Sequence, residues 1–217
     1  MIRPGFAERV EAFVKNGGTF VSTYWSGIVD ECDICFFGGF PGPLRKCLGI
    51  WSEEIDVLYD KESNSIVPSS ANDLALNGSY EAKIFCDLIH AEGAEVLASY
   101  GREFYAGRPA LTRNRVGSGE AYYMASRNDD RFMSDFYGAL AKRLNLRRVL
   151  ETELPEGTTA QMRTDGENEF VFVFNYKRDP ADVAIGDSFQ NVLTGQAAEA
   201  VLHLKGYDSA VLVRKAK

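Results

Sequence analysis

The segment 6–25 restricts the possible folds of this chain more than any other. Residues 6–15 place apolar side chains along one side and charged ones elsewhere, which predicts an amphipathic helix. Gly17 and Gly18 end that helix, and the run 19–25, TFVSTYW, is β-branched and aromatic, as is typical of a buried strand. A helix followed directly by such a strand forms the second half of a βαβ unit, which needs an earlier strand. We therefore expect an α/β fold and a chain that begins inside a domain.

Composition and charge exclude several classes of protein. With 217 residues and 45% hydrophobic positions, the chain can bury one large core or two smaller ones. A net charge of -7 argues against a nucleic-acid partner, because phosphate binding needs a concentrated basic surface. No apolar run approaches the roughly 20 residues that a membrane-spanning helix needs. The N-terminus also lacks the apolar segment of a signal peptide, so we expect a cytoplasmic location and no membrane partner.

The first two thirds of the chain mix strands and helices. The clearest helix is 129–144, in which aromatic and leucine side chains recur every four residues and aspartates occupy the N-terminus. We expect an irregular segment over 61–77. The predicted strands are 50–59, two strands within 79–101 separated at Gly93, and a hairpin formed by 110–115 and 120–126.

The pattern changes after Leu146. Short alternating runs are separated by turn-forming clusters, which predicts a small antiparallel β domain of about 70 residues. Within the run EFVFVFNY, alternate residues face opposite sides, so Phe170, Phe172 and Phe174 form one aromatic face. We expect that face to pack on a partner sheet. The domains predicted are 1–147 and 148–217.

Nucleophilic catalysis finds little support in this chain. In hydrolases and amidotransferases the nucleophile lies in a turn that reads G-x-S-x-G or G-x-C-x-G. The run TYWSG places Trp25 at the nucleophile position and lacks the first glycine. Ser26 is an alternative, but no histidine is near it in the sequence. His90 and His203 lie in apolar β contexts, where a structural role is the commoner one.

Paired carboxylates and metal ligands are two further options. Acidic residues cluster at 30–33 and at 53–56, yet spacing along a loop does not show that two carboxyls face each other, as glycosidic cleavage requires. The C-x-x-C spacing of Cys32 and Cys35 permits a zinc site completed by Cys47, Cys86 or His90. We favour solvated or salt-bridged carboxylates and reduced, mostly buried thiols. The sequence thus predicts no catalytic residue, no metal ligand and no cofactor.

Residues 36–49, FFGGFPGPLRKCLG, form an unusual loop. Glycine and proline fix backbone angles that neither a helix nor a strand sustains, so the segment is expected to be an ordered loop that displays aromatic rings. Such a loop is normally shaped to fit a partner surface or its own domain.

Two long runs resemble one known family. The runs KNGGTFVSTYWSGIVDECDICFFGGFPGPLRKCLGIWSEEIDVLY and GAEVLASYGREFYAGRPALTRNRVGSGEAYYMAS are similar to the trimerisation domain of family 42 glycoside hydrolases, the bacterial β-galactosidases. FVFVFNY and LTG extend the resemblance more loosely toward the C-terminus. The cysteines at 32, 35 and 47 depart from the family pattern.

The resemblance implies a fold and a function. The fold is a partial flavodoxin-like domain, similar to class I glutamine amidotransferases without their cysteine, followed by a small antiparallel β domain. The function is a non-catalytic assembly region of a β-galactosidase whose (β/α)8 barrel hydrolyses terminal β-D-galactosides with retention. No barrel glutamate matches a position here, and 217 residues do not also hold a typical barrel of about 250 residues. We therefore expect this chain alone to be inactive.

The family resemblance also gives the aromatic loop a partner. We expect it to contact a neighbouring subunit of a homo-oligomer, a trimer in the parent enzyme, unless it covers its own sheet. Two other functions remain open: an independent amidotransferase-like hydrolase, and a carbohydrate-binding module that stacks sugars on Trp25 and Trp51. The predicted interface residues are Phe36, Phe37, Phe40, Pro41, Leu44 and Arg45.

Overall fold

A computed structural model describes residues 1–70, 72–186 and 189–216. The chain divides into two compact units, Met1–Leu144 and Asn145–Lys217, each with its own hydrophobic core. We describe each unit by itself.

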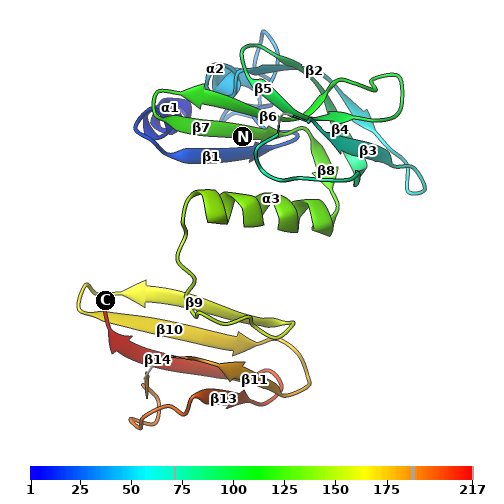
Figure 1. The fold of residues 1–217 in the computed structure, drawn as a ribbon. Coiled ribbons are helices and arrows are strands. Elements are labelled where there is room, and N and C mark those ends of the chain that lie inside the picture. The colour runs from blue at the N-terminus through cyan, green and yellow to red at the C-terminus, as the bar shows by residue number, and fades with distance from the viewer. Residues whose placement is uncertain (71, 187–188, 217) are drawn as a thin grey trace. The chain divides into compact units, whose positions relative to one another are not determined.

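The first unit is built on one large, mostly antiparallel sheet (Figure 1). Its strand order is β1-β7-β6-β5-β3-β4-β2, with β8 paired to β4 beside this path. Of the strand pairs that the described residues form in this sheet, one is parallel, β1 with β7. The strands are β1 (Thr19–Thr23), β2 (Ile50–Val57), β3 (Asn64–Pro68), β4 (Tyr80–Ala91), β5 (Glu95–Tyr100), β6 (Pro109–Val116), β7 (Gly119–Met124) and β8 (Ser126–Asn128).

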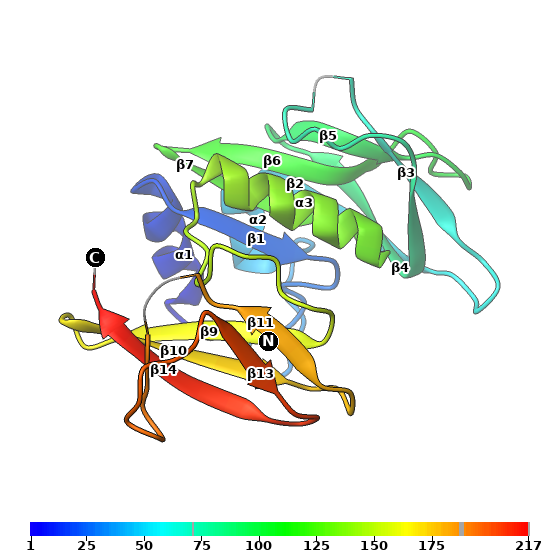
Figure 2. The same cartoon turned by 60° about the horizontal axis from the view of Figure 1, so that its bottom comes forward.

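Helices cover both faces of this sheet. Helix α1 (Phe6–Lys15) and the short α2 (Arg45–Leu48), which continues a 3-10 turn at Gly42–Leu44, lie on one face. Helix α3 (Asp130–Arg143) lies on the opposite face, as Figures 1 and 2 both show. The first unit is therefore mostly β with few helices, although its layers follow an α/β/α order.

Helix α3 shows how sequence and packing agree. The Asp129 side chain accepts a hydrogen bond from the Phe132 backbone N–H at 2.7 Å, which satisfies one of the free donors at the helix start. Phe132, Phe136 and Leu140 are buried at four-residue spacing. The Phe132 ring meets Tyr80 edge to face at 5.2 Å, so the helix is fixed to β4 through aromatic contacts.

The second unit is a small β structure of two facing sheets. Its core contains Val171 and Val173 from one sheet and Val183 and Leu204 from the other. The larger sheet has the order β12-β14-β10-β9, and β11 pairs with β13 in the smaller one. The strands are β9 (Thr158–Thr164), β10 (Asn168–Asn175), β11 (Ala181–Ala184), β12 (Gln190–Asn191), β13 (Val201–Leu204) and β14 (Ser209–Lys215).

Most of the predicted elements are confirmed. The structure contains the predicted helices as Phe6–Lys15 and Asp130–Arg143, the hairpin of β6 and β7, and the two strands broken near Gly93. Three expectations about the elements are wrong. The segment 36–49, expected to be a loop throughout, contains the 3-10 turn Gly42–Leu44 and helix α2, because Pro43 lies in the first turn, where it needs no N–H partner, and Gly49 ends the helix at a φ of 63°. Residues 64–68 of the supposedly irregular segment form β3, whose Asn64 is buried and bonds to the backbone of Arg102. The strand expected over 19–25 ends at Thr23 and is only partly buried, because it lies at an edge of the sheet.

The expectation for the aromatic face of β10 is also wrong. We expected the phenylalanines to pack on a partner sheet, but Val171, Val173 and Asn175 face the core. The phenylalanine side is only partly buried, because the facing sheet of β11 and β13 lies against the valine side. No helix among the described residues is long and apolar enough to cross a membrane.

Candidate interface site

The turn after β1 presents a tryptophan on a fixed backbone. Trp25 has a φ of 57°, a left-handed conformation that a tryptophan rarely adopts. Its backbone N–H donates a hydrogen bond to Asp87 Oδ2 at 3.1 Å. Its ring meets Phe85 edge to face at 4.8 Å, and Tyr24 stacks on the same Phe85 ring at 5.7 Å. Trp25 nevertheless stays 51% exposed.

The carboxylate that holds this turn is deeply buried. Asp87 is 1% exposed, and its Oδ2 also accepts a hydrogen bond from the Tyr123 hydroxyl at 2.6 Å. Its Oδ1 is buried and has no hydrogen-bond partner among the described residues. Burial disfavours the charged form and raises the pKa of Asp87 to about 6, although its two donors oppose this shift.

A small hairpin follows the Trp25 turn. Val29 and Cys35 pair across it, and the Asp30 side chain accepts hydrogen bonds from the backbone N–H groups of Cys32 and Ile34 at 2.8 and 3.0 Å. Asp30 therefore shapes its own turn, as aspartates commonly do. This local role accounts for one of the acidic residues considered above as possible catalysts.

The glycine and proline loop folds back on this hairpin. A side chain at Gly42 would clash with the Phe36 ring at 2.5 Å, so the glycine lets the ring lie against the loop backbone. Arg45 closes the loop, because its guanidinium binds Glu92 and donates to the Gly38 carbonyl at 2.9 Å. The same guanidinium lies 5.6 Å from the centre of the Trp51 ring.

The six predicted interface residues separate into two groups. Pro41 and Leu44 are buried in the first unit, with Leu44 3% exposed, so they support the loop from within. Phe36 is half-buried and packs against the core of the same unit. The residues with surface to offer a partner are Phe37, which is 97% exposed, and the half-buried Phe40 and Arg45.

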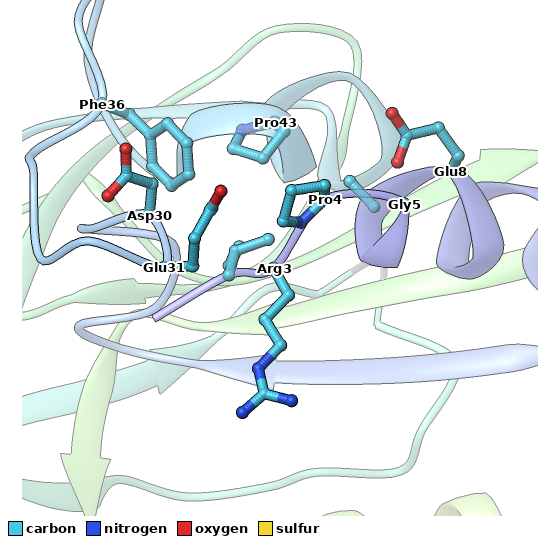
Figure 3. A pocket seen from close by; sticks show the side chains of 10 residues that line it. Arg3, Pro4, Gly5, Glu8, Asp30, Glu31, Phe36 and Pro43 are labelled. Carbon is cyan, nitrogen blue, oxygen red and sulfur yellow. The ribbon is translucent and has the colours of Figure 1, made fainter.

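A shallow cavity of about 300 Å³ opens beside this loop (Figure 3). The Phe36 ring and two prolines form an apolar part of its lining, and Glu8, Asp30 and Glu31 bring carboxylates to it. The Arg3 guanidinium points away from the cavity in this view. The cavity thus combines apolar and acidic lining next to the exposed loop.

Four of the other candidate catalytic groups, Glu53, Asp56 and the two histidines, are held in ion pairs and hydrogen bonds. Glu53 binds Arg108 at 2.9 Å and His90 at 2.8 Å, and Arg108 is the main cause of the lowered pKa of this carboxyl. Asp56 accepts a hydrogen bond from the Tyr105 hydroxyl at 2.8 Å. In the second unit, His203 pairs with Asp182. These partners are those expected of structural and surface ion pairs.

The cysteines do not gather around a common point. Cys32 and Cys35 are exposed on the hairpin, whereas Cys47 and Cys86 are buried in the core. Burial raises the pKa of the Cys86 thiol to about 11, which keeps it protonated. No group of three or more potential metal ligands occurs among the residues that the structure describes.

Sequence reasoning missed the residues that hold the Trp25 turn. Phe85 and Asp87 lie on β4, 60 or more positions further along the chain, and nothing in the local sequence links them to Trp25. The only local signal was an aspartate within an apolar strand, which favours a buried and hydrogen-bonded carboxylate.

The fold and this surface define a mainly β, two-unit protein whose first unit presents an ordered aromatic loop. Comparison with known proteins places the chain in a family. The model of the β-galactosidase trimerisation domain matches residues 1–147, and that of the β-galactosidase C-terminal domain matches residues 157–214. The chain therefore belongs to the family 42 β-galactosidases, and it contains these two domains.

Individual relatives agree with this assignment. The chain is 53% identical over 216 residues to β-galactosidase Pbg of Clostridium perfringens and 45% identical over 218 residues to β-galactosidase BglY of Alicyclobacillus acidocaldarius. It superposes on the crystal structure of the β-galactosidase from Rahnella sp. R3 with a TM-score of 0.87 and 52% identity. These matches cover 99 to 100% of this chain but only 31 to 32% of the relatives, so the chain spans about a third of their length.

Proposed function

We propose that this chain is the non-catalytic assembly and C-terminal part of a β-galactosidase that works as a homotrimer. The match of the trimerisation-domain model over residues 1–147 carries this proposal. The carboxylates of Asp30 and Glu53 and the two histidines support it, because their side chains serve structural contacts. The catalytic step, hydrolysis of terminal β-D-galactosides with retention, is assigned to a barrel in the rest of the parent protein.

We also propose the finer description of the two domains. Residues 1–147 form an amidotransferase-like, partly flavodoxin-like trimerisation domain, and 148–217 form the C-terminal β domain. The parallel pair of β1 and β7, preceded by α1 and covered by helices on both faces, supports the flavodoxin-like part. The cytoplasmic location stays a prediction from the sequence.

The aromatic loop supplies the proposed contact between subunits. Phe37 is almost fully exposed at the tip of a loop that Arg45 and the buried Leu44 hold in place. A rigid aromatic side chain removes a large apolar area from water on binding and has few rotatable bonds to fix. In a three-fold ring each such contact is heterologous and the ring closes by symmetry.

Replacing Phe37 by aspartate should weaken assembly. A charge at this position would lose its hydration in the contact, so we expect the trimer of the wild-type chain to dissociate at the same protein concentration. Sedimentation velocity at several concentrations measures the effect. The matched control is Phe104→Asp, which changes a 78% exposed phenylalanine outside the loop. An unchanged oligomeric state in a folded Phe37→Asp variant contradicts this role for the loop.

The isolated chain should show no turnover of a chromogenic β-galactoside. The reason is that retaining hydrolysis needs an acid and a nucleophile about 5–5.5 Å apart, and the best candidate carboxylates here are engaged elsewhere. A purified β-galactosidase at equal molarity serves as the positive control. Turnover that copurifies with this chain would overturn the non-catalytic assignment.

A further inference from the structure

We propose that Trp25 anchors the contact with a second copy of this chain. Tyr24, Trp25 and Phe85 form a cluster that we name the Trp25 platform. The inference rests on the proposed assembly function and adds to it a binding element outside the loop predicted from the sequence.

Two strained backbone positions build the platform. Trp25 has a φ of 57°, and Ile84, directly before Phe85, has a φ of 68°. A β-branched residue in this region is a true outlier, and Ile84 lies where the register between β4 and β8 shifts. Such conformations persist only where the surrounding structure enforces them, and they gather at functional sites. One of them carries the Trp25 ring, and the other directly precedes Phe85, whose ring contacts Trp25.

The platform is rigid although its main ring faces solvent. The buried Asp87 carboxylate fixes the backbone of Trp25, and the Tyr123 hydroxyl fixes that carboxylate in turn. A ring that is already fixed loses little freedom on binding, and tryptophan is among the residues most enriched at interface hot spots.

A second copy is the occupant because the platform continues the proposed interface. Gly27, two residues after Trp25, lies so close to the loop that a Cβ there would be 2.2 Å from the Pro41 carbonyl oxygen. The exposed Val57 pairs with Phe85 across β2 and β4 and enlarges the apolar surface. The Trp25 platform and the aromatic loop both belong to the matched trimerisation domain, whose partner is another copy of itself.

Sedimentation velocity of Trp25→Ala tests the proposal. We expect the association constant to fall at least about 30-fold relative to the wild-type chain, because hot-spot side chains contribute at this level. Phe104→Ala is the matched control, since it removes an exposed ring outside the platform, and it should assemble like the wild type. Wild-type assembly by a folded Trp25→Ala variant overturns the proposal but leaves the assembly function intact. A wild-type chain that stays monomeric at all concentrations overturns both.

A fluorescence measurement keeps the test valid if Trp25→Ala does not fold. The chain has two tryptophans, so Trp25 is the only tryptophan in the Trp51→Phe variant and is the source of its tryptophan emission. We expect its emission maximum to shift to shorter wavelength as protein concentration rises through the assembly transition. An emission that stays constant through that transition overturns the proposal. A response to added galactose or lactose without assembly also overturns it, in favour of sugar binding.

Discussion

Replacing Arg113 by alanine should lower the free energy of unfolding of the first unit by about 1.5–3 kcal/mol, the range for hydrogen bonds to charged groups. The loss stays in this range because the Asp73 and Glu95 side chains that lose their partner are 44% and 42% exposed and remain partly hydrated. The Arg113 side chain is 1% exposed. It donates to Asp73 at 2.7 Å and to Glu95 at 2.7 Å. Arg143 of α3 binds the same Asp73 at 2.8 Å, so the network joins α3 to β5, β6 and the segment that carries Asp73.

Urea unfolding followed by tryptophan fluorescence measures this loss. Both tryptophans, Trp25 and Trp51, lie in the first unit, so the signal reports that unit alone. Arg115→Ala is the matched control on the same strand. Its side chain is 65% exposed and lies 3.8–3.9 Å from its carboxylate partners, so we expect a change below about 1 kcal/mol. If both variants lose the same free energy of unfolding, the buried Arg113 network contributes no more to stability than the exposed ion pairs of Arg115.

Replacing Asp87 by asparagine should alter the pH dependence of stability. The pKa of Asp87 is raised from 3.8 to about 6 in the folded protein, so the folded state binds a proton more tightly than the unfolded state. The stabilisation from this proton is fully present below pH 3.8 and is lost as the pH rises through 6. A shift of this size corresponds to at most about 3 kcal/mol between the two limits.

Asparagine carries no charge to bury, so the variant should lack this loss. We expect the free energy of unfolding of the variant, relative to that of the wild type, to increase from pH 4 to pH 8. Urea titration at each pH measures this difference. Tyr123→Phe should act in the opposite direction, because it removes a donor to the charged carboxylate and so costs most at high pH. Parallel pH profiles for wild type and Asp87→Asn would exclude a buried, titrating Asp87.

Local patterns predicted much of the fold for physical reasons that operate within a few residues. Helix α3 was predicted to within one residue at each end, because its four-residue apolar spacing and its N-terminal aspartates act locally. The hairpin around Gly117 and Gly119 was also predicted, from the turn-forming glycines between two apolar runs. Strand β3 was missed because its polar Asn64 is acceptable in a strand only through backbone partners on a distant segment.

The candidate site was predicted only in part. The sequence indicated an ordered aromatic loop at 36–49, and the structure contains one over 36–41, followed by the 3-10 turn Gly42–Leu44 and helix α2. It did not distinguish the exposed Phe37 from the buried Leu44, since both are apolar residues in the same loop. That difference depends on which side chain meets the core of the unit.

The sequence by itself determined the two longer helices α1 and α3, most strands, the change to short alternating runs after Leu146 and the family resemblance. Each of these depends on neighbouring residues or on continuous runs. Only the tertiary structure decided which face of a strand is buried. Successive side chains of a strand alternate between its two faces, but in β10 both faces are apolar. The alternation therefore does not reveal that the valines, and not the phenylalanines, contact the facing sheet. The Trp25 platform likewise exists only in the folded chain, because its parts, Trp25 and Asp87, are 62 residues apart and meet through strand pairing.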